Sequence, residues 1–297
     1  MKKYKVLIIG AGPAGIAAAI YLQRAGVDFI LVEKSAVGGL IVNANCVENY
    51  PGFPNGISGV KFAELLRRHI QRWKILVHIE EILRLDFSNE VFIAETTENI
   101  YLAEYVIRAT GTEPKQIEIS GSCDVDIQLI SYEIRQILTV SGERIAIVGA
   151  GDAAFDYALT LSERNSVLIL NRTDSTKCLS LLKERVKKIP KIEYRSNITI
   201  SKISQETGIL TLHFQQNVVR ENVHRLVIAI GREARANFLE NNLCEHVPSL
   251  REQNRFFTVG DAVNGDFRQT SIAVGDGVRA AMSIISILNK NENYCTN

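Results

Sequence analysis

The sequence has few cysteines and histidines, and none of them is spaced as a metal or redox pair. Its five cysteines in 297 residues show neither the density of a disulfide framework nor a Cys-x-x-Cys pattern. The five histidines are equally dispersed, so no metal site is expected. These absences exclude a disulfide-stapled fold and a zinc-type centre, and they favour a reducing, cytoplasmic location.

The chain also lacks an excess of charge of one sign. Its 34 Lys and Arg residues nearly balance 33 Asp and Glu residues, for a net charge of +1, so neither nucleic acid nor an anionic membrane is an expected partner. Beyond residues 6–22, no apolar run approaches the roughly 20 residues that span a bilayer. Glycines and a proline interrupt residues 6–22, which argues against a secretory signal. The expected partners are small molecules or proteins.

A strand, a glycine-rich loop, a helix and a second strand open the chain. Residues 5–9 and 28–33 predict buried parallel strands and residues 14–25 a helix. The loop between them reads Gly10-Ala11-Gly12-Pro13-Ala14-Gly15. Its glycines allow a tight turn and a close approach of backbone amides to a pyrophosphate, to which the helix N-terminus adds partial positive charge. With Glu33 placed to accept hydrogen bonds from ribose hydroxyls, the pattern predicts dinucleotide binding.

The same pattern returns in the second half of the chain. Strands are expected at 144–148 and 167–170, around the loop Gly149-Ala150-Gly151-Asp152-Ala153-Ala154 and a helix. The second strand ends in Asn171 without an acid, so Arg172 and Lys177 could pair with a 2′-phosphate, which favours NADPH over NADH. The alternative is a unit that keeps the fold and binds no nucleotide.

The order of elements predicts an α/β fold with two Rossmann-like, three-layer nucleotide-binding domains, each with a β-meander. An amphipathic helix is expected at 60–73, a meander within 76–102 and strands at 105–109, 225–230 and 256–259. The last strand, with a closing helix from about residue 269 to 288, resembles neither unit on its own. We therefore expect a first domain of residues 1–114 and 246–297, with a second domain of residues 115–245 inserted into it.

Further motifs, together with the two glycine loops, resemble those of the low-molecular-weight thioredoxin reductases over nearly the whole chain. They are Gly38-Gly39, Glu48-Asn49-Tyr50-Pro51-Gly52-Phe53, Ala109-Thr110-Gly111-Thr112, Gly260-Asp261 and Arg268-Gln269 through Gly275-Asp276-Gly277. The resemblance implies FAD in the first domain, NADPH or NADH in the second, and a homodimer. It also implies that Asn49 lies beside the FAD, that Asp261 bonds the ribitol, and that Gln269 and its helix N-terminus face the flavin O2 edge. A helix dipole there would favour the anionic reduced flavin.

The motifs and the resemblance together indicate two sets of cofactor-contacting residues. The FAD set is Gly10, Gly12, Pro13, Ala14, Gly15, Glu33, Lys34, Gly39, Leu40, Asn49, Ile82, Thr110, Gly111, Gly260, Asp261, Arg268, Gln269 and Thr270. The NAD(P)H set is Gly149, Gly151, Asp152, Ala153, Arg172, Lys177 and Gly231.

The chain departs from this family at the redox dithiol. In the family a Cys-x-x-Cys precedes the second glycine loop, whereas the corresponding residues 131–136 here contain no cysteine. We therefore expect an FAD-dependent NAD(P)H oxidoreductase that passes electrons to an acceptor other than thioredoxin, either a ferredoxin-like protein or a small molecule. One alternative is a thiol, disulfide or peroxide reductase acting through Cys46, whose spacing from Gly38-Gly39 resembles that of a glutathione reductase cysteine. Another is a non-catalytic flavin-binding or sensor protein, or a flavoenzyme that does not use nicotinamide.

Overall fold

The computed structural model describes residues 2–215 and 220–295, with side chains through residue 290, and it divides into two compact units. The first unit comprises Met1–Val42, Glu48–Glu113 and Ala234–Asn297, and the second comprises Asn43–Val47 and Pro114–Glu233. The second unit therefore ends before the expected boundary at residue 245. The reason is that helix α5 (Asn241–Glu252) packs against strands β4 (Ile82–Ser88) and β17 (Phe256–Thr258) of the first unit.

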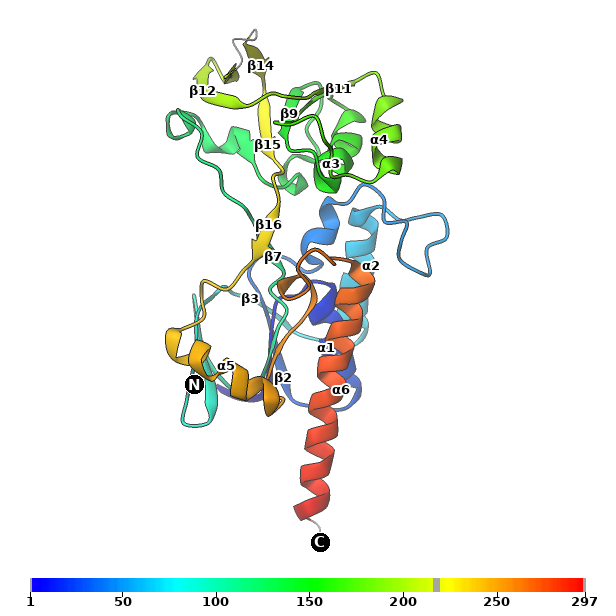
Figure 1. Cartoon of the computed structure of the whole chain (residues 1–297). Coiled ribbons are helices and arrows are strands. Elements are labelled where there is room, and N and C mark those ends of the chain that lie inside the picture. Colours follow the sequence, from blue (N-terminus) through cyan, green and yellow to red (C-terminus); the bar gives the residue numbers. More distant parts are fainter. Residues whose placement is uncertain (1, 216–219, 296–297) are drawn as a thin grey trace. The chain divides into compact units, whose positions relative to one another are not determined.

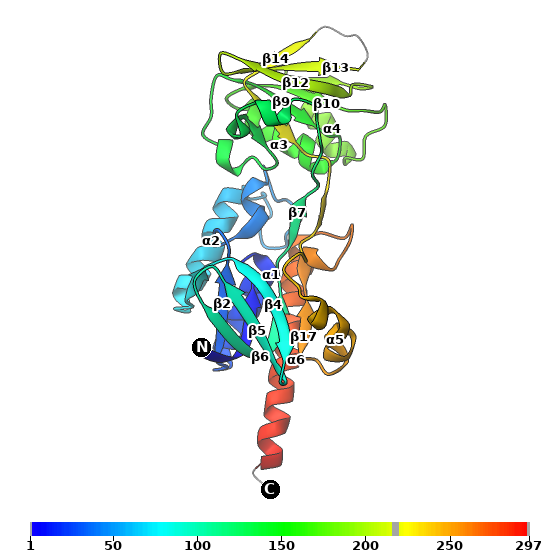
Figure 2. The same ribbon diagram turned by 90° about the vertical axis from the view of Figure 1, so that its left-hand side faces the viewer.

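A seven-stranded mixed sheet forms the centre of the first unit, with strand order β3-β2-β1-β6-β5-β4 and β17 beside β6 (Figure 2). Strands β1, β2, β3, β6 and β17 run parallel, and β4 and β5 are antiparallel additions at one edge. The last residues of the expected meander, 100–102, and the expected strand at 105–109 belong to one continuous strand, β6. The remaining elements of this unit are β1 (Lys2–Ile9), α1 (Pro13–Arg24), β2 (Phe29–Glu33), η1 (Gly39–Asn43), α2 (Gly59–Arg72), β3 (Val77–Ile79), β5 (Val91–Thr96), β6 (Ile100–Arg108), η5 (Gly260–Ala262) and α6 (Thr270–Cys295).

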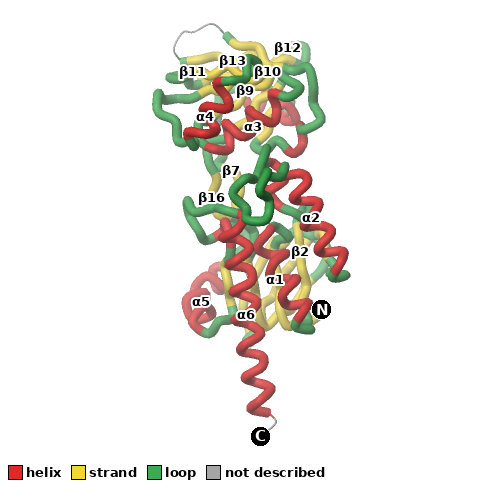
Figure 3. Tube along the Cα trace, turned by 90° about the vertical axis from the view of Figure 1, so that its right-hand side faces the viewer, coloured by secondary structure: helices red, strands yellow, loops and turns green. Residues whose placement is uncertain are grey.

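The two faces of this sheet are covered differently. Leu7 and Ile9 of β1 join a buried cluster with Phe238 and with Leu243 of α5. Alternate residues of a strand point to opposite faces, so the residues between them face the other way. Helices α1 and α6 lie side by side (Figures 1 and 3), so close together that a Cβ atom on Gly277 would overlap the carbonyl oxygen of Ala14.

Helix α6 is longer and more apolar than the sequence analysis anticipated. Its segment Thr270–Lys290 is long and apolar enough, by length and composition alone, to cross a membrane, so the expectation that no such run exists is wrong. A core helix of a folded protein passes the same test when it is mostly buried, whereas 28% of this apolar window is buried, with Ala273, Ala280 and Ile284 among the buried residues of α6. The small side chains of α6 let its backbone approach α1, which explains why this helix is rich in small apolar residues.

The second unit is a three-layer arrangement around a parallel sheet of order β11-β10-β9-β15-β8. Ile145, Ile147 and Phe155 belong to a cluster on its helical face, whereas Ala146 and Leu168 contact the antiparallel sheet β12-β13-β14 on the other face. The elements are η2 (Ser122–Asp124), η3 (Ile127–Leu129), β8 (Ile130–Ser131), η4 (Arg135–Ile137), β9 (Arg144–Val148), α3 (Asp152–Ser162), β10 (Ser166–Leu170), α4 (Ser180–Lys187), β11 (Ile192–Arg195), β12 (Ile200–Glu206), β13 (Ile209–Phe214), β14 (Glu221–Val223) and β15 (Arg225–Ile228). Short strands β7 (Thr112–Pro114) and β16 (Arg232–Ala234) pair where the chain passes between the units.

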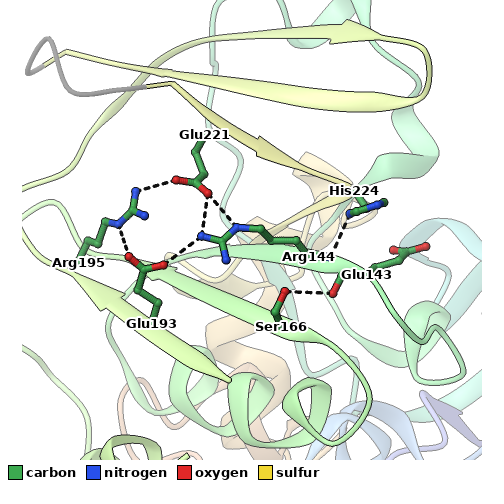
Figure 4. Close-up of polar contacts among 7 residues, drawn as sticks. All are labelled: Glu143, Arg144, Ser166, Glu193, Arg195, Glu221 and His224. Carbon is green, nitrogen blue, oxygen red and sulfur yellow. Dashed lines mark hydrogen bonds and ion pairs between the residues drawn. The ribbon is translucent and has the colours of Figure 1, made fainter. Parts of the chain in front are cut away.

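A network of ion pairs ties the antiparallel sheet of the second unit to its parallel sheet (Figure 4). Arg144 Nη2 lies 2.7 Å from Glu221 Oε1 and 3.0 Å from Glu193 Oε2. Arg195 contacts the same two carboxylates, at 2.7 Å from Glu193 and 2.8 Å from Glu221. Two positive and two negative side chains balance within the network, which therefore has the character of a structural cross-link.

Candidate functional site

The first glycine loop has the geometry that a bound pyrophosphate requires. Gly10 has φ of 104°, which favours glycine, and a Cβ atom there would overlap the Ala109 carbonyl oxygen. A Cβ atom on Gly15 would overlap the carbonyl oxygen of Gly10. At Gly12, by contrast, an added Cβ atom would meet nothing within 4 Å, so this glycine faces open space at the N-terminus of α1. Gly10 and Gly15 thus serve the fold, and Gly12 leaves room for a ligand.

Segments far apart in the sequence converge on this loop. The amide of Gly38 donates to the carbonyl oxygen of Ala11 at 2.8 Å, and a Cβ atom on Gly39 would lie 3.1 Å from the Cα atom of Gly12. From the other end of the chain, a Cβ atom on Gly260 would lie 3.1 Å from the Cβ atom of Ala14. The fold therefore brings the Gly38-Gly39 pair and the Gly260-Asp261 turn against the first glycine loop.

Glu33 ends β2 and is buried beside the loop. Its Oε2 accepts a hydrogen bond from the amide of Ala11 at 2.7 Å, and its Oε1 accepts one from the amide of Ser35 at 2.9 Å. The amide of Glu80 donates to the carbonyl oxygen of Glu33 at 3.0 Å, which places the start of β4, at Ile82, next to this strand end. The carboxylate is thus oriented by backbone amides, and its bond to a ribose remains a prediction.

Two side-chain amides meet at the start of α6. Asn49 Nδ2 donates to Gln269 Oε1 at 2.6 Å, which joins the Glu48–Phe53 loop to the helix. Both residues were predicted from the resemblance to lie at the flavin. Thr110, predicted for the same site, donates through Oγ1 to the carbonyl oxygen of Arg235 at 3.2 Å.

Asp276 is a positioning residue that the predicted FAD set left out. Its Oδ2 accepts from the amide of Gly260 at 3.1 Å and from Asn264 Nδ2 at 2.7 Å. It therefore holds the turn that carries Asp261. The signal for it was present in the Gly275-Asp276-Gly277 motif, but only the folded chain shows which turn the carboxylate fixes.

The second glycine loop repeats the geometry of the first. Gly149 has φ of 138°, and a Cβ atom there would overlap the carbonyl oxygen of Ala229. An added Cβ atom at Gly151 would meet nothing within 4 Å, and this residue is the N-cap of α3. Because helix N-termini attract anions, the open space before α3 suits a second pyrophosphate.

The loop after β10 lies against this second glycine loop. The amide of Lys177 donates to the carbonyl oxygen of Ala150 at 2.9 Å, and the amide of Leu179 donates to Asp152 Oδ1 at 2.7 Å. Asp152 therefore anchors the loop that carries Arg172 and Lys177, both of which are exposed.

Asn171, which replaces the acid at the end of β10, is buried and has a structural role in the loop. Its Nδ2 donates to the carbonyl oxygen of Ser175 and to the hydroxyl of Tyr194, both at 2.9 Å. Its amide therefore stabilises the loop from within and leaves the two exposed basic side chains to meet a ligand.

The other predicted residues lie on the same loops or next to them. Gly111 and Gly231 have φ of 62° and 114°, respectively, so both adopt conformations that favour glycine. The remainder are Lys34 directly after β2, Leu40 in η1, Arg268 and Thr270 on either side of Gln269, and Ala153 in the first turn of α3.

Residues 131–136 of the second unit correspond to the place of the Cys-x-x-Cys in the thioredoxin reductases. Here they contribute one partner of an ion pair. Glu133 Oε1 lies 3.0 Å from Arg232 Nη2, and neighbouring Ile134 is completely buried. Burial raises the pKa of nearby Tyr157 to about 12, so its hydroxyl stays protonated at neutral pH.

No metal centre or disulfide was found in the described part of the chain. The described side chains of residues 2–215 and 220–290 contain no group of three His, Cys, Asp or Glu that could hold a metal ion. Cys46 is half-buried and unpaired, in the short segment that groups with the second unit.

Comparison with known proteins places this chain in a family. A family model described as pyridine nucleotide-disulphide oxidoreductase matches residues 4–277. The chain belongs to this family. The α/β fold with two Rossmann-like nucleotide-binding domains is confirmed, because this oxidoreductase also matches a solved structure of the same architecture, the thioredoxin reductase of T. acidophilum. The TM-score is 0.81 at 25% identity, over 96% of this chain and 99% of that one.

Curated relatives of this oxidoreductase carry one recurring name. Thioredoxin reductase 2 of Arabidopsis thaliana is 30% identical over 94% of this chain and 81% of its own length. The thioredoxin reductase of Mycoplasma genitalium is 29% identical over 95% of this chain and 94% of its own length. The similarity thus extends over both units.

Proposed function

We propose that the first unit binds FAD and that the protein is an FAD-dependent oxidoreductase. The open space at Gly12, at the N-terminus of α1, fits a pyrophosphate, because backbone amides there can donate without obstruction by a side chain. Glu33 lies beside the same loop for the ribose, and Asn49 with Gln269 lies at the start of α6 for the flavin. The residues present therefore fit this cofactor.

The second unit is the proposed site for NADPH, with NADH as the competing nucleotide. Gly151 offers the same open helix N-terminus as Gly12, and the loop that carries Arg172 and Lys177 is tied to it by hydrogen bonds. Two exposed basic side chains without an acid at the strand end favour a 2′-phosphate.

The acceptor is proposed to be something other than thioredoxin, namely a ferredoxin-like protein or a small molecule. The observation that carries this proposal lies in residues 131–136, which contain no thiol for dithiol exchange. Glu133 of this segment forms an ion pair with Arg232 instead. The relatives named thioredoxin reductases point the other way. A carboxylate held by a guanidinium cannot exchange with a disulfide, so the chemistry of these side chains outweighs the name.

In this scheme the flavin would supply the redox chemistry, exchanging a hydride with nicotinamide. The protein contributes binding and orientation: the glycine loop holds the pyrophosphate, and Asp276 fixes the turn that carries Asp261. The N-terminus of α6 provides partial positive charge beside Gln269. No protein nucleophile is needed. A cytoplasmic location and a homodimeric state remain predictions.

Anaerobic mixing of the purified flavin-bound protein with NADPH and with NADH tests the proposal. We expect NADPH to bleach the flavin absorbance band faster than NADH, because of Arg172 and Lys177. The Arg172→Gln variant should lose that preference and still bind flavin. If neither nucleotide bleaches the band, the nicotinamide assignment is wrong.

A second assay addresses the acceptor. Turnover of NADPH with ferricyanide should proceed, and turnover with an oxidised thioredoxin should not. Rapid reduction of thioredoxin by the wild-type chain would refute the proposed acceptor class while leaving the FAD and NADPH assignments intact.

A further inference from the structure

Arg108 is a buried cation at the carboxyl end of β6. Arg108 as a whole is 7% exposed, and its Nε atom is fully enclosed without a hydrogen-bond partner among the described residues. It is paired in register with Ile9 and thus belongs to the sheet face on which Ile9 clusters with Leu243 and Leu250 of α5. Burial of a cation without a partner is costly, so the position calls for an explanation.

The charges around Arg108 do not neutralise it. Burial lowers the pKa of the Arg108 guanidinium, and the positive charge of Arg251 lowers it further, whereas Cys244 acts in the opposite direction. No carboxylate appears among these groups in the described chain. The two arginines therefore lie near each other, and no carboxylate among these groups offsets the charge of Arg108.

Thr258 connects the two arginines. It is the register partner of Arg108 on neighbouring parallel strands, so the two side chains project from the same face of the sheet. Arg251 Nη2 donates to Thr258 Oγ1 at 3.3 Å from the last turn of α5. The three residues form a cluster of hydrogen-bond donors, which we call the Arg108–Arg251–Thr258 cluster.

The cluster lies where open α/β sheets bind ligands. Arg108 and Thr258 are the last residues of β6 and β17, and ligands bind preferentially outside the carboxyl ends of parallel strands. Guanidinium groups and a hydroxyl match the oxygens of a phosphate group, to which arginine donates pairs of hydrogen bonds.

We infer that the Arg108–Arg251–Thr258 cluster is a binding site for a phosphate group, built from side chains and not from the backbone amides of the glycine loops. The occupant is inorganic phosphate or a phosphomonoester, whose dianion relieves the repulsion between the arginines. The inference does not depend on the proposed redox function, since it needs only the folded first unit.

Titration of the flavin-bound full chain with inorganic phosphate at constant ionic strength, with chloride as the reference anion, tests the site. We expect saturable binding in calorimetry and a rise in melting temperature of about 2 °C. Arg251→Gln, an exposed position that leaves the core intact, should weaken phosphate binding at least tenfold, as should Arg108→Gln if it folds. A parallel titration with AMP distinguishes the sources, counting only the binding that Arg251→Gln weakens: tighter binding of AMP at the cluster identifies a phosphomonoester, and tighter binding of phosphate identifies the free anion.

Arg84→Gln is the matched control, because Arg84 lies in the same unit but already contacts Asp86, Glu95 and Glu240. This variant should bind phosphate like the wild type. Undiminished binding in Arg251→Gln would place the anion at a glycine loop and overturn the inference. Absence of binding to the wild type, or an equal effect of chloride, would overturn it as well.

Discussion

The substitutions Gly12→Ala and Gly151→Ala form a matched pair that separates the two nucleotide sites. Both residues precede a helix, have φ of −79° and −94°, and face open space, so alanine introduces no strain and no clash. The free energy of unfolding of each apoprotein should therefore change by less than about 0.5 kcal/mol.

The effect on binding follows from the size of the added methyl group. An amide reaches a phosphate oxygen at about 2.9 Å, and a methyl group on the same loop displaces that oxygen. Loss of one hydrogen bond to a charged group costs about 1.5–3 kcal/mol, which is a weakening of roughly 10-fold to 100-fold. Gly12→Ala should show this loss for FAD, and Gly151→Ala should show it for NADPH.

Flavin fluorescence quenching on titration of each apoprotein with FAD, and stopped-flow reduction of the reconstituted variants by NADPH, measure the two effects. Gly151→Ala should bind FAD like the wild type. If Gly12→Ala retained wild-type FAD affinity, or if Gly151→Ala lost it, the assignment of FAD to the first loop would be wrong.

Three further outcomes are expected. Gly277→Ala should lower the free energy of unfolding in urea by about 1–3 kcal/mol or more, because its Cβ atom would overlap the Ala14 carbonyl oxygen; unchanged stability would contradict the close packing of α1 and α6. The hydrogen bond from Arg195 lowers the pKa of Glu193, so the stabilisation it provides is present above the unfolded pKa of about 4.3 and is lost as the pH falls through the lower folded value. The free energy of unfolding of the wild type should thus exceed that of Glu193→Gln by at most about 1 kcal/mol at pH 7. The two free energies, taken from denaturation curves, should converge in acid. Cys46→Ser should retain NADPH turnover with ferricyanide, and loss of turnover with flavin still bound would favour the single-cysteine alternative.

The local pattern of the sequence was enough to predict the nucleotide-binding architecture. Glycines at 10, 12 and 15 between an apolar strand and a helix have few other uses, and the repetition at 149 and 151 predicted a second unit of the same kind. Periodicity located β1, α1, β2 and α2 to within a few residues, because a short run of buried apolar residues marks each strand and an apolar stripe marks each helix.

Several features depended on the folded chain. Helix α5 was not predicted, and so the expected boundary of the second unit lies after the observed one. The helix has few apolar residues, and Leu243 and Leu250 are recognised as core residues only from the sheet that they cover. The sequence around Asp276 did not indicate that its carboxylate accepts hydrogen bonds from the turn that carries Asp261.

Arg108 shows most clearly where sequence and tertiary structure divide. The sequence by itself determined that residues 105–109 form a strand that ends at the Ala109–Thr112 loop, since β-branched and aromatic residues favour that conformation. Only the tertiary structure decided that Arg108 is enclosed and that Arg251 and Thr258 lie beside it. The reason is physical: alternation along a strand tells which residues share a face, but what covers that face is contributed by segments far away in the chain.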